Sequence, residues 1–407
     1  MHDTLAAMSI EIRRPDENEW SAICYSDGRA FGLSYTPEGV AQRRPLHDLS
    51  RWRIAVDTAT GDIVSEASSY SFDVTLPGGS TVPMGGVTWV ATAATHRRIG
   101  LMRRVIGAVH DDIDARGETL STLSASEGGI YEHVGYGIAT RARMTTIDPR
   151  STAIRSEFRA APGSVRFLRE DEDVFDVIAP IWERYRRTRV GEVSRSTPWH
   201  DFAIDQLSRG EGSSTVAYYL VHAEGYAIYR IKSQWNDGQP AHIMNLEEIA
   251  AVTADAHAAL WQTLLEVDLV GEIRSRVLAI DDPLPYLLDN QRALRTTDLN
   301  DGIWVNIRDV ATAFGARNYR TTDRIVVEAD GMRWAIDGGP DGGSCKAVRT
   351  RPDLITSHSG LSSLLYGGVL PSALVSGRRM TARTAEAAAR ADLFFTTSLA
   401  PHCLTHY

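Results

Sequence analysis

Apolar positions in the first 150 residues alternate or cluster in ways that predict an α+β unit. We assign strands where apolar and polar residues alternate, and helices where apolar residues recur every three or four positions. One helical face is especially regular and consists of Met102, Val105, Ile106, Val109 and Ile113. The predicted elements are a strand at 9–13, a helix at 17–25, a loop or short helix at 37–45, strands at 52–56, 63–76 and 86–93, a helix at 96–116, and strands at 120–125 and 144–147.

The same order of elements returns after Asp148-Pro149-Arg150, which we take as a domain boundary. The predicted elements of this second unit are a strand at 164–167, helices at 170–186 and 198–206, strands at 214–222, 225–232 and 243–250, a helix at 253–267 and a strand at 276–279. Because the order repeats, the sequence predicts a duplicated fold, with a first domain at 1–148 and a second at 149–296.

The remaining residues, 297–407, predict a third and smaller α+β domain. Its predicted elements are strands at 304–307, 324–327 and 332–336, a glycine-rich turn at 338–343, and helices at 353–359, 360–366 and 382–391. We find no catalytic motif in this unit.

The junction between the strand at 86–93 and the helix at 96–116 carries candidate chemistry. Thr95 is the predicted N-cap, which places His96-Arg97-Arg98 in the first helical turn. Cations there oppose the helix dipole, at a cost of about 0.3–1 kcal/mol each. An anion on the free N–H groups would remove that penalty, and Gly100 would allow close backbone approach. The junction therefore predicts a site for a phosphate-bearing cofactor, and an ordinary helix start is the alternative.

The second unit lacks the residues of this junction. When Thr253 is aligned with Thr95, Asp255, Ala256 and Ala258 stand where Arg97, Arg98 and Gly100 stand. The second copy thus loses both basic side chains and the glycine and gains a negative charge. We predict one cofactor site per chain.

Composition narrows the class of protein. The formal net charge of −9 argues against a general nucleic-acid binder. Cys24, Cys345 and Cys403 are widely spaced, which predicts neither a disulfide framework nor a metal site. The chain has no secretory leader pattern and no apolar run long enough to span a membrane, so a cytoplasmic protein without membrane contact is expected.

A second motif follows the junction and identifies a family. GxGxxG, GxxxxGK[ST], HExxH and GxSxG are all absent, which removes the main support for several common enzyme classes. Residues 125–137 read ASEGGIYEHVGYG, and residues 95–101 read THRRIGL. Together they resemble the enhanced-intracellular-survival (Eis) family of acetyltransferases, within the GNAT superfamily. The resemblance covers the whole chain. It implies two tandem GNAT folds, the second without a cofactor site, followed by an α+β domain resembling sterol carrier protein.

The resemblance also implies roles for particular residues, with acetyl-CoA as the cofactor. Val90, Ala91 and Thr92 would face the pantetheine arm, on a strand splayed from its neighbour. The pyrophosphate would lie on Arg97, Arg98 and Gly100, with Leu101 and Met102 on the following turn and Ser126 near the thioester. Tyr131 matches the tyrosine assigned as general acid, and the C-terminal carboxylate, here on Tyr407, matches the proposed base.

These two roles are chemically reasonable. A phenol, with a reference pKa of about 10, can protonate a departing thiolate. A terminal carboxylate, with a reference pKa of about 3.5, is a poor base unless burial raises its pKa or water relays the proton. The apolar residues of the tail would carry it inward: Leu399, Ala400, Pro401, Cys403 and Leu404.

The acceptor side departs from the family pattern. Family members with aminoglycoside pockets use an acid from the N-terminal helical region and another just before the last residue. Here the penultimate residue is His406, and Asp27 is a candidate for the N-terminal acid. Trp89 either lines the acceptor pocket or packs across the sheet.

The predicted function is therefore acetyl-CoA-dependent N-acetylation of primary amines, on aminoglycosides at several positions or on lysine side chains. A homohexamer is expected from the resemblance, with a small-molecule or peptide amine as the acceptor. One alternative is a polyamine acetyltransferase with the same machinery. Another is a cofactor-binding scaffold with vestigial acetyl transfer, whose third domain binds a lipid or a partner.

Overall fold

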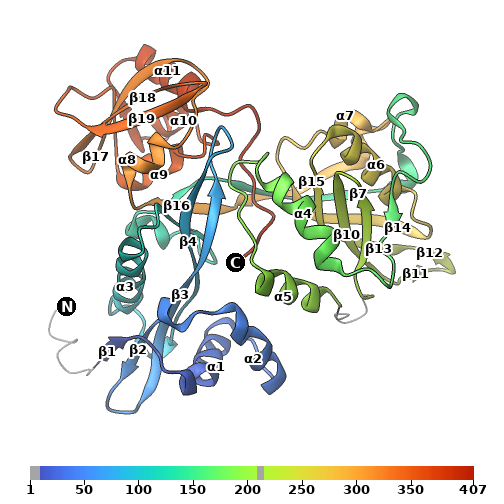
Figure 1. The fold of residues 1–407 in the computed structure, drawn as a ribbon, viewed down its shortest axis with the longest axis horizontal. Coiled ribbons are helices and arrows are strands. Elements are labelled where there is room, and N and C mark those ends of the chain that lie inside the picture. The colour runs from blue at the N-terminus through green and yellow to red at the C-terminus, as the bar shows by residue number, and fades with distance from the viewer. Residues whose placement is uncertain (1–9, 209–214) are drawn as a thin grey trace.

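The computed structural model describes residues 10–208 and 215–407, and these form three lobes (Figure 1). Residues 1–9 and 209–214, with the ends of two predicted strands, lie outside the described residues. Two lobes are built on seven-stranded sheets and the third on a five-stranded sheet. The C-terminus lies between the lobes rather than at the edge of the molecule (Figure 1).

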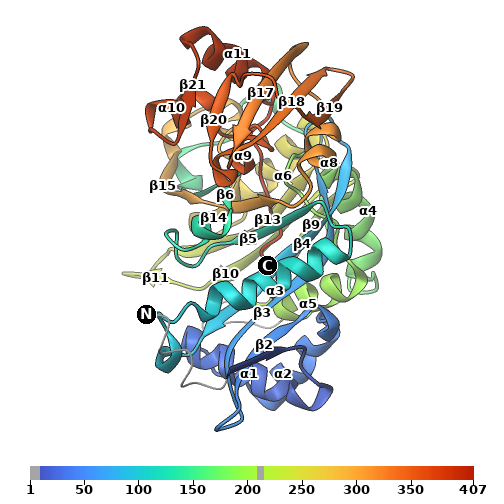
Figure 2. The same ribbon diagram turned by 90° about the vertical axis from the view of Figure 1, so that its left-hand side faces the viewer.

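The first lobe is a mixed sheet with helices on both faces. Its strands, in sheet order, are β1 (Ile10–Arg13), β2 (Arg53–Asp57), β3 (Asp62–Thr75), β4 (Thr81–Thr92), β5 (Leu120–Ser124), β16 (Ile303–Ile307) and β6 (Gly137–Ile138). The predicted apolar face of α3 (Leu101–Ala115) packs on one side (Figure 2), and α1 (Trp20–Phe31) and α2 (Pro37–Arg43) cover the other. The ambiguous segment at 37–45 is therefore a short helix, begun by a Thr36 cap and Pro37.

The second lobe repeats this plan. Its strands, in sheet order, are β15 (Leu294–Asp301), β7 (Arg141–Ile147), β14 (Val270–Leu278), β13 (His242–Ala251), β10 (Gly225–Lys232), β9 (Tyr218–His222) and β8 (Arg166–Phe167). Helices α4 (Val174–Arg186) and α6 (Ala254–Leu265) pack on opposite faces. The lobe also holds α5 (Thr197–Ser208), α7 (Leu284–Leu287) and a hairpin of β11 (Trp235–Asn236) and β12 (Gln239–Pro240). The predicted duplication of the fold is confirmed.

Two strands lie in different sheets from the ones predicted. The strand predicted at 144–147 to close the first domain is β7, which pairs with β14 and β15 in the second sheet. The strand predicted at 304–307 in the third unit is β16, which fills the first sheet between β5 and β6. These two assignments were wrong because alternating apolar residues predict a strand but not its partner. The first two lobes are also joined through backbone hydrogen bonds, because the Thr75 N–H donates to the Glu192 carbonyl and the Gly191 N–H donates to the Thr75 carbonyl, each at 2.9 Å.

The third lobe is a sheet of β19 (Gly342–Ala347), β18 (Met332–Gly339), β17 (Asp323–Ala329), β20 (Leu354–Thr356) and β21 (Met380–Ala382), in that order. Its helices are α8 (Val310–Gly315), α9 (His358–Leu364), α10 (Pro371–Ser376) and α11 (Ala385–Phe395). The helix predicted at 353–359 is wrong. Leu354 is instead fully buried in β20, which pairs in parallel with β17, and the helix begins only after the Ser357 cap.

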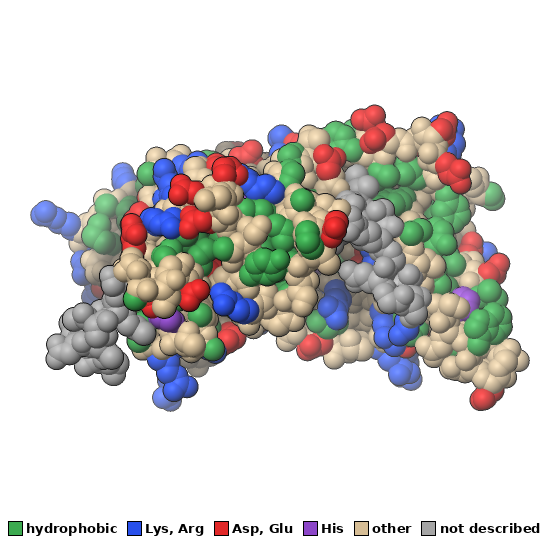
Figure 3. Space-filling model, turned by 90° about the horizontal axis from the view of Figure 1, so that it is seen from below, with side chains coloured by type: hydrophobic (Ala, Val, Ile, Leu, Met, Phe, Trp, Pro, Cys, Tyr) green, Lys and Arg blue, Asp and Glu red, His purple; other side chains and the backbone are tan. Residues whose placement is uncertain are grey.

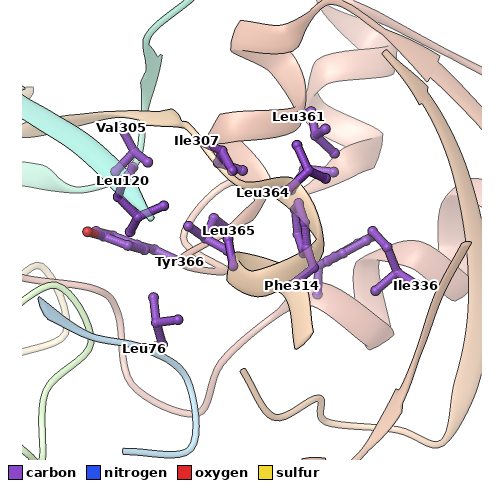
Figure 4. Close-up of a cluster of buried hydrophobic side chains, with 14 of the residues drawn as sticks. Leu76, Leu120, Val305, Ile307, Phe314, Ile336, Leu361, Leu364, Leu365 and Tyr366 are labelled. Carbon is purple, nitrogen blue, oxygen red and sulfur yellow. The ribbon is translucent and has the colours of Figure 1, made fainter. Parts of the chain in front are cut away.

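The third lobe shares one hydrophobic core with the first (Figure 4). Leu76, Leu120 and Val305 from the first lobe belong to the same buried cluster as Phe314 and Leu365 from the third. The third lobe is therefore packed against the first sheet, and the C-terminal tail that follows α11 begins from this packed lobe.

Replacing Arg317 with methionine is expected to lower the free energy of unfolding by about 3 kcal/mol or more. The buried guanidinium donates to the carbonyls of Leu364 at 3.0 Å and Phe395 at 2.7 Å, where α9 and α11 end. The variant would remove the Arg317 donor from both carbonyls, and only the Leu364 carbonyl would keep another, the Gly367 N–H at 3.1 Å. Urea unfolding measures the effect, with Arg324→Met, which removes an exposed ion pair to Asp337, as the control expected to change stability by less than about 1 kcal/mol. Equal midpoints for both variants would contradict the prediction.

Two global properties complete the description. No helix in residues 10–208 and 215–407 is long and apolar enough to cross a membrane. On the face shown in Figure 3, basic and acidic side chains are interspersed with hydrophobic ones. The expectation that the chain does not bind nucleic acid stays a prediction.

Candidate active site

The site is built around a pair of parallel strands that diverge. β4 and β5 are paired only from Met84–Gly86 to Leu120–Thr122, and beyond these residues the strands part. Trp89 lies just past this point with a φ of 53°, where the register of β4 against β3 shifts. Such a bulge bends a strand and increases its twist, which helps to open the gap. The splayed strand implied by the resemblance is present.

A groove of about 790 Å³ follows the gap toward the start of α3. All nine residues proposed from the sequence to bind the cofactor line it: Val90, Ala91, Thr92, Arg97, Arg98, Gly100, Leu101, Met102 and Ser126. Tyr131 lines the same groove. The segments 90–102 and 126–131, which are separate in the sequence, therefore line the same groove.

The start of α3 differs from the prediction. The helix begins at Leu101, with Gly100 at the N-cap position in the left-handed region at a φ of 77°. Thr95 lies in a separate turn, where its hydroxyl contacts His96 Nδ1 at 2.8 Å, so it does not cap the helix. Arg97 and Arg98 precede the helix instead of occupying its first turn. The prediction was wrong because left-handed backbone at Arg98 (φ 65°) and Gly100 delays the helical hydrogen bonds.

The observed junction still fits a polyanionic cofactor. No side chain caps α3, so the first N–H groups of the helix remain as donors toward the groove. A Cβ on Gly100 would meet no atom within 4 Å, so the space above this turn is open. The Arg97 side chain is 61% exposed and pairs only loosely with Glu127, at 3.7 Å. In the second lobe, by contrast, the Thr253 hydroxyl accepts from the Ala256 N–H at 3.3 Å and caps α6.

Tyr131 lies where the groove meets a second pocket. This smaller pocket, of about 280 Å³, shares Phe31, Val90, Ser126 and Tyr131 with the groove. Tyr131 is only 5% exposed, and burial raises the pKa of its phenol, an effect that a hydrogen bond to Ser126 partly offsets. The phenol is therefore held in its protonated form next to both spaces.

The C-terminal residues enter the smaller pocket from the far end of the chain. His406 and Tyr407 line it together with Trp89 and Tyr131. The Tyr407 hydroxyl lies 2.6 Å from Thr122 Oγ1, and its ring packs on Phe72 with centroids 5.1 Å apart. Gly86 makes room for both rings, because a Cβ at this position would lie 2.8 Å from the Phe72 ring and 3.0 Å from the Tyr407 ring. The structure therefore brings the two residues proposed as acid and base into one pocket.

Trp89 both lines this pocket and packs in an aromatic cluster, so the two interpretations of this residue are compatible. Its ring stacks on Tyr35 at 5.9 Å and contacts Trp52 at 5.4 Å. His47 lies in the same cluster, where burial lowers its pKa to about 3. This cluster supports the pocket wall. No sequence motif marks it, and its only signal in the sequence is the recurrence of aromatic residues in the N-terminal 60 residues.

The two acceptor candidates differ in their placement. Asp27 is 4% exposed and accepts a hydrogen bond of 2.5 Å from the Tyr35 hydroxyl. Burial raises the pKa of Asp27, and the residue is not among those that line either pocket. His406 lines the smaller pocket, and desolvation lowers its pKa. Phe31, at the end of α1, lines both spaces and was missed.

Comparisons with known proteins agree with this geometry. A family model described as an acetyltransferase (GNAT) domain matches residues 11–139, and a second with the same description matches residues 191–308. The chain is 30% identical over 404 residues to the N-acetyltransferase Eis of Mycobacterium tuberculosis, covering 96% of this chain and 98% of that protein. The crystal structure of Eis1 from Mycobacterium abscessus superposes with a TM-score of 0.84 at 28% identity, covering 98% of this chain and 100% of Eis1.

A GCN5-related N-acetyltransferase from Anabaena variabilis has the same fold, with a TM-score of 0.81 at 16% identity and coverage of 98% and 100%. The duplicated sheets and the groove beside the diverging strands thus define an acetyltransferase of the GNAT class. Within that class, the chain belongs to the Eis family of N-acetyltransferases.

Proposed function

We propose that this chain transfers the acetyl group of acetyl-CoA to primary amines, with Tyr131 as general acid and the Tyr407 carboxylate as base. The observation that carries the proposal is the meeting of Tyr131 and the C-terminal residue in one pocket that opens into the cofactor groove. Membership of an N-acetyltransferase family supports the reaction class.

Different residues of the groove would bind different parts of acetyl-CoA. Arg97, Arg98 and the N–H groups after Gly100 would hold the pyrophosphate. The unpaired edge of Val90–Thr92 would bind the pantetheine arm through its backbone. Acetyl-CoA, when bound, supplies an activated acetyl group as a thioester.

Two residues of the chain would then transfer one proton each. The Tyr131 phenol holds one at Oη, beside Ser126, and gives it to the departing sulfur. The Tyr407 carboxylate would take one from the attacking amine, directly or through water. Contacts of the Tyr407 ring with Phe72 and of its hydroxyl with Thr122 hold this residue at the pocket. The proton lost by the amine and the proton gained by the sulfur balance.

The smaller pocket sets the class of acceptor. About 280 Å³ is near the lower limit of ligand pockets, so it admits one amine-bearing arm rather than a whole polycation. Its aromatic wall and terminal carboxylate favour a cationic group. Several amines of one aminoglycoside could enter in turn, which would give acetylation at more than one position, and a lysine side chain or a polyamine also fits this description.

Release of free thiol from acetyl-CoA tests the proposal against a panel of aminoglycosides, polyamines and lysine peptides. Turnover with one class, lost in Tyr131→Phe, would support the mechanism and identify the acceptor. Tight acetyl-CoA binding without turnover on any amine would overturn it and favour the scaffold alternative.

Replacing Arg98 with alanine is expected to raise the KM for acetyl-CoA about tenfold with little change in kcat. The side chain lines the groove, and losing one charged contact to phosphate weakens binding by about 1.5–3 kcal/mol before solvent screening. Arg104→Ala is the matched control, because Arg104 is exposed on α3 and is not among the residues that line the groove. Equal KM values for the two variants would contradict the assignment.

We also propose the homohexamer that the family resemblance implies. Sedimentation velocity of the full chain measures the assembly directly, and a monomer at micromolar concentration would contradict it.

A further inference from the structure

The C-terminal tail reaches the first lobe by way of the second. After α11 the backbone N–H of Ala400 donates to Asp281 Oδ2 at 2.7 Å, and Arg189 donates to the Ala400 carbonyl at 3.1 Å. The N–H of His402 then donates to the Val190 carbonyl at 2.8 Å. The tail is therefore fastened to the second lobe before its last residue enters the pocket of the first.

The second lobe has a diverging strand pair like that of the first. β13 and β14 are paired only as far as Leu246 and Ser275. Just beyond this point on β14, the Val277 carbonyl accepts a hydrogen bond of 3.0 Å from His402 Nε2. Just beyond it on β13, Glu248 binds Arg195 through two hydrogen bonds of 3.0 and 2.9 Å. The tail is thus bound where the strands part, directly on one side and through Arg195 on the other.

Arg195 links this strand pair to the tail. Its Nε donates to Thr405 Oγ1 at 2.9 Å, and its guanidinium lies 3.4 Å from the centroid of the Trp182 ring. The Tyr226 hydroxyl donates to Glu248, so the carboxylate that holds Arg195 is itself fixed. The Arg195 and Glu248 side chains are only 7% and 13% exposed, so water screens their hydrogen bonds less than it would at the surface.

Glu192 adds a contact to the tail backbone. Its side chain is fully buried, and Oε1 accepts a hydrogen bond of 2.9 Å from the Leu404 N–H. The Leu404 side chain packs against the cluster formed by α4 and the second sheet. Residues 402 and 405 are therefore held by the second lobe. Residue 404 is held by Glu192, on a segment that follows α4 and also forms backbone hydrogen bonds with Thr75 at the end of β3.

We propose that the second lobe, which lacks the residues of the cofactor junction, serves as a clamp that positions the catalytic tail, with Arg195 as a positioning residue. We define the clamp as Glu192, Arg195, Glu248 and the Val277 carbonyl. Only His406 lies between Thr405 and Tyr407, so fixing Thr405 restricts the Tyr407 Cα to a radius of about 7 Å. This inference rests on the proposed function of the tail, but the holding of the tail can be measured separately.

The test alters the tail and leaves the clamp intact. The double variant His402→Leu/Thr405→Val in the full chain removes both side-chain hydrogen bonds to the second lobe while conserving most of the side-chain volume. Thr397→Val is the matched control, because its hydroxyl donates to the Leu399 carbonyl at 2.7 Å in the same tail but outside the clamp.

Two readouts are needed. Release of Tyr407 by carboxypeptidase A reports whether the tail is held, and steady-state kinetics report whether its carboxylate is positioned. We expect the double variant to lose Tyr407 at least about tenfold faster and to show a kcat lowered at least about tenfold, with the KM for acetyl-CoA unchanged. The control should match the unaltered protein in both.

The outcomes separate the clamp from the proposed chemistry. Unchanged release of Tyr407 would overturn the clamp, whatever happens to kcat. Faster release with unchanged kcat would support the holding of the tail and overturn the role of these two hydrogen bonds in positioning the carboxylate, while the base itself is tested by deletion of Tyr407. The double variant leaves the acetyl-CoA groove untouched, so an altered affinity for acetyl-CoA would show general damage to the fold, and the urea midpoint checks for such damage. In that case Arg195→Lys provides a second variant, which keeps the charge but loses the forked contact with Glu248.

Discussion

Replacing Tyr131 with phenylalanine is expected to lower kcat by about 10²–10⁴-fold while leaving the affinity for acetyl-CoA nearly unchanged. The substitution removes the hydroxyl and keeps the ring, so the wall shared by the groove and the smaller pocket stays filled. Without the phenol, the sulfur must leave as an uncompensated thiolate or take a proton from water. Thiol release measures turnover, and isothermal titration calorimetry measures acetyl-CoA binding.

Tyr136→Phe is the matched control for this prediction. Tyr136 belongs to the same motif and contacts Tyr131 at a centroid distance of 6.0 Å, but its hydroxyl lies within hydrogen-bonding distance of Ser121 and His110 in the core. Its loss should lower stability and leave kcat nearly intact. Full turnover by Tyr131→Phe, or equal losses in both variants, would remove Tyr131 from the mechanism.

The raised pKa of Tyr131 also fixes the sign of one pH effect. Burial favours the neutral phenol, so the proton donor is present at neutral pH and is lost only at a pH above the ordinary phenol range. Activity should therefore not fall between pH 8 and about pH 10 through ionisation of Tyr131. A fall in that range that persists in a correctly folded enzyme would have to come from another group.

Deleting Tyr407, so that the chain ends at His406, is expected to lower kcat by about 10²-fold or more. The deletion moves the terminal carboxylate by one residue and removes the ring that packs on Phe72. The acetyl-CoA groove does not include Tyr407, so acetyl-CoA should still bind. Stopped-flow thiol release and a binding titration on the same preparation separate the two effects.

Tyr407→Phe is the control that isolates the carboxylate. It keeps the chain length, the carboxylate and the ring, and it loses only the hydroxyl that contacts Thr122 at 2.6 Å. We expect it to retain most of the activity. If the deletion variant turned over as fast as the full chain, the tail would have no part in the chemistry, and the clamp in the second lobe would have only a structural role.

Most residues proposed for the candidate site lie in two short, continuous segments that carry the resemblance to the Eis family. Residues 90–102 contain a strand, a loop and a helix start, and residues 125–137 contain the motif with Ser126 and Tyr131. Residues that are close along the chain are also close in space, so these two segments could each be expected to contribute a continuous part of one wall of the groove. The placement of Asp27 could not, because its pairing with Tyr35 depends on how α1 meets the loop that follows it.

Three features could be predicted from the residues alone: the duplicated order of elements, the apolar face of α3, and the absence of the Arg97, Arg98 and Gly100 equivalents in the second copy. These features depend on periodicity and on neighbours along the chain, whereas most of the groove residues were assigned from the resemblance to the Eis family. Four features required the folded chain: β7 and β16 lie in each other's predicted sheet, α3 begins at Leu101, β20 is a strand, and the tail is hydrogen-bonded to the second lobe before its last residues line the pocket of Tyr131. The physical reason is that strand pairing and burial are long-range: Thr122 and Tyr407 lie 285 residues apart, and no local pattern records their contact.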